Sequence, residues 1–131
     1  MPEAQKLVAS VLDAYNRGDI AFIQARIAAD CPWSGSLSPE VPYGGQFTGP
    51  AGAAKFFESI GTNIDVKIFE VERYVSEGEH VVALGNWSGV ARKTGGSYSA
   101  RFALYFQARG GKIIRFTGHE DTAVTAIAFR G

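Results

Sequence analysis

The chain has 131 residues, of which 46% are hydrophobic and 20% are charged, and this composition is typical of one globular domain. Thirteen Lys and Arg residues balance thirteen Asp and Glu residues, so the basic surface of a nucleic-acid-binding protein is not expected. No apolar run approaches the roughly 20 residues that span a bilayer, and the N-terminus lacks the pattern of a signal peptide. We therefore expect a cytoplasmic protein without a membrane partner.

The cysteine and histidine content argues against a metal site. Cys31 is the one cysteine, so it cannot form an internal disulfide. The two histidines, His80 and His119, stand too far from other ligand residues to make a recognisable zinc motif. We expect neither a metal nor an organic cofactor.

Two helices are predicted at the N-terminus. Between residues 3 and 17, apolar residues recur at helical spacing, namely Leu7, Val8, Val11, Leu12 and Tyr15. Gly18 suits the left-handed conformation that ends a helix, and Asp19 is a good N-cap for a second, short helix. Residues 16–19 therefore predict a tight corner between two helices.

The next part of the chain is rich in turn-forming residues. We expect a short strand around residues 31–37 and then a long ordered loop, because three prolines and four glycines fall within residues 31–49. Pro50 suits the first turn of a third helix, and Gly61 is expected to end it. The buried face of this helix is predicted to consist of Phe56, Phe57 and Ile60.

From residue 63 the apolar period changes to two, which indicates strands. Four long strands are predicted, over residues 63–75, 80–91, 98–108 and 112–120, joined by turns that contain glycine. Three helices followed by these strands predict an α+β fold in a single domain, residues 1–131. The helices should pack on one face of a strongly curved, mainly antiparallel sheet.

Several short motifs, taken together, resemble a known family. They are Tyr15-Asn16-Arg17-Gly18-Asp19, residues 42–49, Thr94-Gly95, Gly111-Lys112-Ile113 and Asp121-Thr122-Ala123. In this order and spacing they resemble the SnoaL-like branch of the nuclear transport factor 2-like (NTF2-like) superfamily, which includes ketosteroid isomerase, limonene epoxide hydrolase and polyketide cyclases. The resemblance implies a cone closed at one end by helices, with a pocket inside the curved sheet. It also implies a homodimer formed through the outer sheet face.

The catalytic groups of those relatives are missing from the matching positions. The resemblance places the steroid isomerase base near Gly35 or Ser36, and its oxyanion-hole donors at Val11 and Ala103. The acid used by the hydrolase and the cyclases falls on Gly118. The resemblance therefore predicts the fold without carrying over any of these reactions.

The most specific chemical hypothesis concerns another pair of charged residues, Arg101 and Glu120. The resemblance places Arg101 and Tyr105 on the inner face of the third long strand, and strand alternation from Gly118 turns Ile114, Phe116 and Glu120 inward. The register of the Gly110-Gly111 turn then brings Arg101 near Glu120.

In apolar surroundings Glu120 would have a raised pKa and act as general acid or base. Arg101 would hold it ionised or bind a substrate anion. A structural salt bridge at the rim of the cone is the alternative interpretation.

Other side chains are second candidates. His119 is predicted on the outer face, and Asp121 is either an auxiliary catalytic group or the N-cap of a terminal turn or helix. Aromatic residues that could line the pocket favour a small apolar or aromatic ligand, although ordinary core packing explains them equally well. They are Trp33, Tyr43, Phe56, Trp87, Tyr105 and Phe116.

Three functions remain open from the sequence. The first is a cofactor-independent enzyme with proton-transfer chemistry of the isomerase, cyclase or hydrolase type at Glu120 and Arg101, with His119 and Asp121 as auxiliaries. The second is a non-catalytic carrier or sensor of a small molecule. The third is a protein-interaction module that uses the sheet face.

Overall fold

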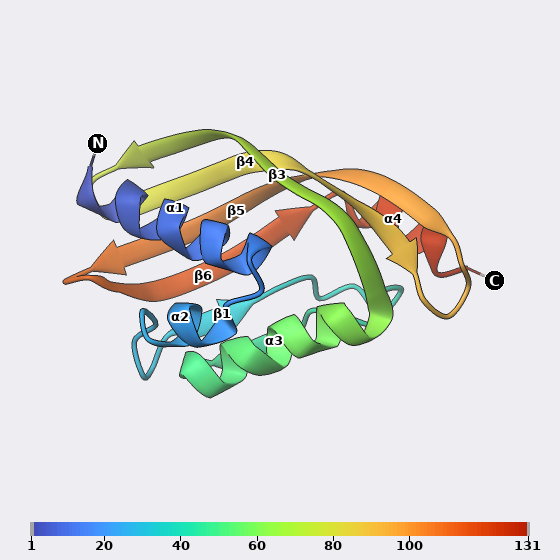
Figure 1. Ribbon diagram of the computed structural model, residues 1–131, viewed down its shortest axis with the longest axis horizontal. Helices are drawn as coiled ribbons and strands as arrows, with labels where there is room; N and C mark the ends of the chain where they lie inside the picture. The colour runs from blue at the N-terminus through green and yellow to red at the C-terminus, as the bar shows by residue number, and fades with distance from the viewer. Residues whose placement is uncertain (1, 131) are drawn as a thin grey trace.

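A strongly curved sheet arches over a layer of helices that pack on its concave face (Figure 1). The computed structural model describes residues 2–130. Its helices are α1 (Glu3–Asn16), α2 (Ile20–Gln24), α3 (Gly49–Asn63) and α4 (Thr122–Ala128). Its strands are β1 (Pro32–Ser34), β2 (Gln46–Thr48), β3 (Ile64–Glu77), β4 (His80–Ala91), β5 (Ser97–Arg109) and β6 (Lys112–Glu120). Within the described residues, no helix combines the length and hydropathy needed to cross a bilayer.

The predicted helix corner is confirmed. Val8 and Val11 of α1 are fully buried, and Gly18 takes the left-handed conformation with φ of 74°. The Asp19 side chain accepts a hydrogen bond of 3.1 Å from the backbone N–H of Phe22, so it caps α2 as expected. The third helix runs to Asn63, so the predicted end at Gly61 is wrong by two residues.

The four long strands match their predicted ranges within two residues, but the predicted loop before α3 contains a further strand. Strand β2 pairs antiparallel with β1, and β1 pairs parallel with β6, so the six strands run in the order β2-β1-β6-β5-β4-β3. At three residues each, β1 and β2 are too short to show a period in the sequence. The observed class is α+β, with a mixed sheet.

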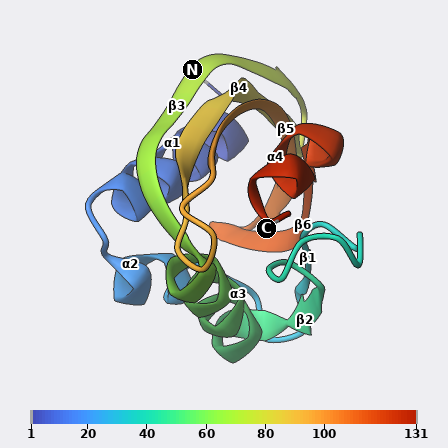
Figure 2. The same cartoon turned by 90° about the vertical axis from the view of Figure 1, so that its right-hand side faces the viewer.

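The curvature of the sheet depends on Gly85 of β4. Strand β3 departs from regular pairing between Val71 and Arg73, and Gly85 lies opposite Val71 at this point. A Cβ atom on Gly85 would overlap the carbonyl oxygen of Glu70 and lie 2.8 Å from Cζ of Phe102. Because a hydrogen takes this place, β3 crosses β4 closely, and the sheet curls around the helices as seen end-on in Figure 2.

We predict that Gly85→Ala destabilises the protein by about 1–3 kcal/mol, because the added methyl group has no free volume to occupy. Urea unfolding followed by circular dichroism measures the change. The matched control is Gly61→Ala in α3, where the new methyl meets no atom within 4 Å and the better helix propensity stabilises by up to about 1 kcal/mol. Equal unfolding midpoints for the two variants would contradict this role of Gly85.

Candidate functional site

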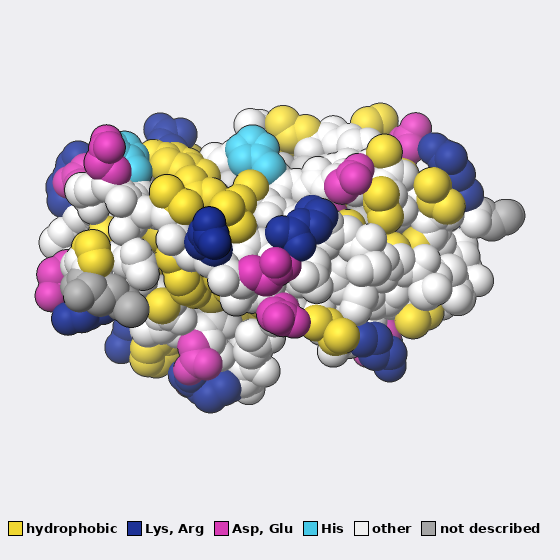
Figure 3. All heavy atoms as spheres, turned by 90° about the horizontal axis from the view of Figure 1, so that it is seen from above, with side chains coloured by type: hydrophobic (Ala, Val, Ile, Leu, Met, Phe, Trp, Pro, Cys, Tyr) yellow, Lys and Arg dark blue, Asp and Glu magenta, His cyan; other side chains and the backbone are white. Residues whose placement is uncertain are grey.

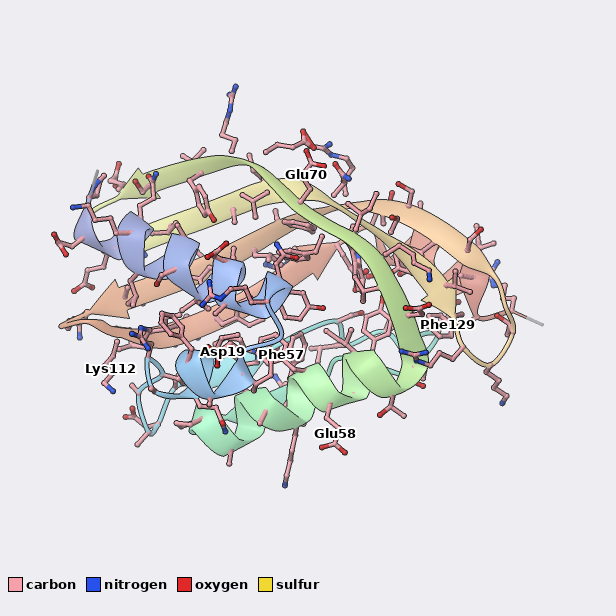
Figure 4. All side chains as sticks on the ribbon, viewed as in Figure 1. Asp19, Phe57, Glu58, Glu70, Lys112 and Phe129 are labelled. Carbon is pink, nitrogen blue, oxygen red and sulfur yellow. The ribbon has the colours of Figure 1, made fainter. Side chains whose placement is uncertain are left out.

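A cavity of about 80 Å³ lies between the helices and the concave face of the sheet. Of the six aromatic residues predicted to line a pocket, five do so, namely Trp33, Tyr43, Phe56, Trp87 and Phe116. Phe57 on the inner side of α3 adds to the wall, whereas Glu58, the next residue, points to the outside (Figure 4). The helix periodicity of α3 therefore supplies one wall, and the strand alternation supplies the other.

The volume limits what the cavity admits. An engineered apolar cavity of about 150 Å³ takes up benzene, and the present cavity has about half that volume. Without movement of its walls, the cavity holds only a small molecule or part of a larger one. The loop that carries Tyr43 forms part of the wall, and its displacement would enlarge the space.

Glu120 is the polar centre of the cavity. Of the described residues that border it, Glu120 alone carries a carboxyl group, and none is a lysine or an arginine. The Tyr43 hydroxyl donates a hydrogen bond of 2.9 Å to Oε2 of Glu120. Burial is the main cause that raises the pKa of Glu120, and the Asp121 charge adds to it, while the Tyr43 hydrogen bond opposes the shift.

Further polar groups surround this carboxyl. Trp87 and Thr125 lie close enough to Glu120 to lower its pKa, although only the Tyr43 hydrogen bond has normal geometry. The ring of Trp87 meets Tyr43 at 5.7 Å and Tyr98 at 5.0 Å, both edge-to-face. Burial raises the pKa of both tyrosines, so they are neutral hydrogen-bond donors at neutral pH.

Three buried donor atoms have no hydrogen-bond partner within the described part of the chain. They are Nε1 of Trp33, Nε1 of Trp87 and Oη of Tyr98. An unpartnered buried donor costs free energy, and such groups in native structures call for a specific explanation. Two of these residues, Trp33 and Trp87, line the cavity, so a bound molecule is one source of the missing acceptors.

The predicted ion pair between Arg101 and Glu120 is wrong. Strand β5 places Phe102 opposite Glu120, so neighbouring Arg101 lies on the outer face of the sheet. There its Nη1 contacts Oε1 of Glu72 at 2.6 Å, and both side chains are substantially exposed. An exposed pair of this kind contributes little to stability. Glu120 therefore has no lysine or arginine partner in the cavity.

Tyr105 is also on the outer face, so its predicted place in the pocket is wrong. Its hydroxyl lies 2.6 Å from Nδ1 of His80, the first residue of β4. The same alternation that removes Arg101 from the cavity removes Tyr105, because both stand at odd positions of β5 while Tyr98, Ala100 and Phe102 are buried.

A bulge in β6 changes which side chains of that strand point inward. Gln107 pairs with Arg115 and Ala108 pairs with Ile113, so Ile114 has no partner in the register. Ile113 is buried in its place, and the predicted inward position of Ile114 is wrong. Beyond the bulge the predicted alternation is confirmed, since Phe116, Gly118 and Glu120 border the cavity.

The auxiliary candidates lie outside the polar centre. His119 borders the cavity, but the residue is exposed. It pairs with Ala103 in the strand register, on the outer face as predicted. Asp121 stands at the N-cap position of α4, yet its carboxylate makes no capping hydrogen bond. Asp121 acts on Glu120 through its charge.

Sequence reasoning missed several residues of the site. Tyr98 and Thr125 belong to the polar centre, and Phe69 and Phe102 line the cavity as a stacked pair with ring centres 4.9 Å apart. A signal for β5 was present, because polar Ser97, Ser99 and Arg101 alternate with buried residues. Thr125 gave no signal, because its importance comes from how α4 folds back on β5.

No group of three His, Cys, Asp or Glu side chains in residues 2–130 lies close enough to hold a metal ion. Cys31 is buried, and this burial raises the pKa of its thiol to about 11, so the reactive thiolate is not formed at neutral pH.

Comparisons with known proteins identify the fold. The SnoaL-like domain family matches residues 8–116. An NTF2-like protein from Burkholderia thailandensis superposes with a TM-score of 0.91 at 27% identity, with 100% of both chains covered. A proposed polyketide cyclase from Xanthomonas campestris has a TM-score of 0.82 at 22% identity, covering 97% of this chain and 96% of that one. A proposed isomerase from Bacillus subtilis has a TM-score of 0.78 at 17% identity, covering 96% and 91%. A search of curated proteins gave no significant match.

The raised pKa of Glu120 predicts a specific pH dependence of stability. The folded state binds this proton more tightly than the unfolded state, so Glu120 lowers the free energy of unfolding as pH rises from the ordinary glutamate pKa to the raised one. Relative to Glu120→Gln, which does not titrate, the wild type should lose stability across this interval and show a constant difference outside it.

Denaturant unfolding of both proteins at a series of pH values measures this difference. Tyr43→Phe removes the donor that favours the ionised carboxylate, so it should extend the interval to higher pH. A wild type that gains stability over Glu120→Gln as pH rises would show that the carboxyl is not in the environment described.

Proposed function

Because the chain belongs to the SnoaL-like domain family, we propose that it binds a small, largely apolar molecule in the cavity under the sheet, where Glu120 transfers a proton. One observation carries this proposal: a partly buried carboxyl with a raised pKa borders an aromatic cavity that contains no lysine or arginine. Raising the pKa of a carboxyl above its ordinary value makes it a better general base when ionised and keeps it available as a general acid at higher pH.

The contacts of Glu120 suit proton transfer. Tyr43 binds Oε2, and no described residue donates a hydrogen bond to Oε1, which leaves this oxygen for a ligand. The carboxylate is therefore positioned by one oxygen and reactive at the other. An anionic ligand would meet a carboxylate without any cation to offset the repulsion, so the ligand is uncharged in this proposal.

The neighbours support the class of chemistry only in general terms. Two of them are called a proposed polyketide cyclase and a proposed isomerase. Their identities of 22% and 17% extend only the fold to this chain. The case for proton transfer here therefore rests on Glu120.

A carrier or sensor is the second candidate. It is favoured because two positions where the resemblance places catalytic groups lack them. Ala103 is on the outer face, and Gly118 has no side chain. A carrier would bind the same class of ligand in the same cavity, and Glu120 would then serve recognition alone.

Proton exchange on a small ketone tests the enzymatic proposal. In D₂O, the wild type should accelerate the exchange of the α-hydrogens of cyclopentanone for deuterium by tenfold or more over Glu120→Gln, because general-base catalysis typically contributes at least about a hundredfold. Loss of the α-hydrogen signal in ¹H NMR spectra measures the rate. Glu72→Gln, which changes a carboxylate on the outer face, is the matched control and should retain the wild-type rate.

The exchange rates and the NMR signals together distinguish catalysis by Glu120 from the alternatives. Equal exchange rates for the wild type and Glu120→Gln would remove the proton-transfer role. If cyclopentanone still perturbs the NMR signals of cavity residues in both proteins, that result would favour the carrier. If no cavity signal changes with any small ring, the cavity itself would not be a ligand site.

We also propose that the outer sheet face pairs with a second copy of the chain. Val82 and Leu84 of β4 and Ala103 and Tyr105 of β5 are half-buried, side by side in the register, and Val75 of β3 extends the row. Figure 3 shows hydrophobic side chains gathered on this face among charges of both signs. A two-fold copy can bury the apolar row against itself and set opposite charges together at its edge.

Sedimentation velocity tests this assembly. The wild type should sediment as a dimer at micromolar concentration, and Leu84→Glu should shift it to a monomer because a carboxylate would be buried in the interface. Ile127→Glu, on the exposed side of α4, is the matched control and should stay dimeric. A monomeric wild type at this concentration would contradict the proposal.

A further inference from the structure

A hydrogen-bond donor and a hydrogen-bond acceptor stand side by side in the cavity without partners. The donor is Nε1 of Trp87, whose side chain is 94% buried and has no hydrogen bond within the described residues. The acceptor is Oε1 of Glu120, which receives no hydrogen bond from the described residues, while Tyr43 donates to Oε2. Tyr43 brings the two groups to one part of the cavity, because its hydroxyl binds Glu120 while its ring meets the Trp87 ring at 5.7 Å.

We propose that Trp87 and Glu120 together recognise the hydroxyl group of a small uncharged alcohol or phenol. The ligand hydroxyl donates to Oε1 of Glu120 and accepts from the indole N–H of Trp87, while its hydrocarbon part lies among the aromatic walls. The inference rests on the proposed function in one respect only, namely that the cavity is the ligand site. It adds the chemical class of the ligand.

The chemistry of the pair selects a hydroxyl over other polar groups. A carbonyl only accepts, so it would satisfy Trp87 but face the ionised carboxylate with a second acceptor. An ammonium group only donates, so it would leave the Trp87 N–H unpaired. A carboxylate ligand would meet like charge with no lysine or arginine on the cavity wall. A hydroxyl does both and carries no charge to desolvate.

The neighbouring polar groups do not take over this role. Tyr43 comes from the loop and already donates to Oε2, and Thr125 of α4 donates to the backbone of Thr122. Tyr98 of β5 lies beside the Trp87 ring, and its neutral hydroxyl is a further unpartnered group that could bind a second ligand oxygen. Asp121 is exposed and influences Glu120 by charge.

Three cyclic compounds of nearly equal size distinguish the contribution of the hydroxyl group from that of the hydrocarbon ring. They are cyclopentanol, cyclopentanone and methylcyclopentane. Each is titrated into ¹⁵N-labelled protein at a pH above the raised pKa of Glu120, and the indole N–H signals of Trp87 and Trp33 are followed. Cyclopentanol should move the Trp87 indole proton downfield, as hydrogen bonding does, and methylcyclopentane should not. Trp33 stacks on Phe116 and borders the same cavity, so its indole signal separates a general response of the cavity from one specific to Trp87.

Two conservative variants give a second readout. Trp87→Phe removes the donor and Glu120→Gln removes the charged acceptor, and each should weaken cyclopentanol binding about three- to tenfold, the loss expected for one hydrogen bond. Neither should change methylcyclopentane binding by more than about twofold. Cyclopentanol should bind more tightly as pH rises through the pKa of Glu120, whereas cyclopentanone should bind more weakly.

The outcomes separate this inference from the proposed function. If methylcyclopentane and cyclopentanol both bind, and neither variant nor pH distinguishes them, the hydroxyl inference is overturned while the cavity remains a ligand site. If cyclopentanone gains affinity with rising pH instead, the pair recognises a carbonyl and the inference is also overturned. If none of the three rings changes a cavity signal, the proposed ligand site itself fails.

Discussion

The hydrogen bond from Tyr43 to Glu120 joins the loop before α3 to the end of the last long strand, and the cavity depends on it. Tyr43 is almost fully buried, so the bond holds the loop as a wall while it positions the carboxyl. The carboxyl in turn has a raised pKa mainly because it is partly buried behind that wall. Wall and reactive group are thus coupled: a movement of the loop that admits a ligand also exposes Glu120 to solvent.

Charges are distributed in two very different ways. On the surface, Arg101 pairs with Glu72 and Arg109 pairs with Glu79, and the hydrogen bonds from Arg109 and Gln107 lower the pKa of Glu79 to about 2. Under the sheet, Glu120 has hydroxyl and indole groups around it instead of a cation. Pairing would hold Glu120 ionised and unreactive, whereas neutral donors leave its protonation sensitive to a ligand. The absence of a lysine or arginine beside Glu120 therefore fits the proton-transfer role proposed for this carboxyl.

The sequence predicted the elements better than the orientation of their side chains. The helix corner and the four long strands follow from local signals, such as the Asp19 cap and the period of two. The predicted inward positions of Arg101 and Tyr105 are wrong because they follow from the resemblance. The alternation of polar and apolar residues along β5 points both side chains outward. Ile114 was misplaced by a bulge, which adds one residue and reverses the alternation without any mark in the sequence. The inward position of Glu120 was predicted correctly because it lies beyond the bulge. Tyr43 comes from a distant segment, and Thr125 reaches Glu120 only because α4 folds back on the sheet.

The central claim is that Glu120 is a partly buried, titrating carboxyl at a proposed ligand site. Its side-chain carboxyl ¹³C shift, followed by NMR as a function of pH with and without cyclopentanol, measures this directly. We expect a pKa above the ordinary glutamate range in the free protein, and a lower pKa when the alcohol donates to the ionised form. A pKa at or below the ordinary range, unchanged by cyclopentanol, would contradict the account.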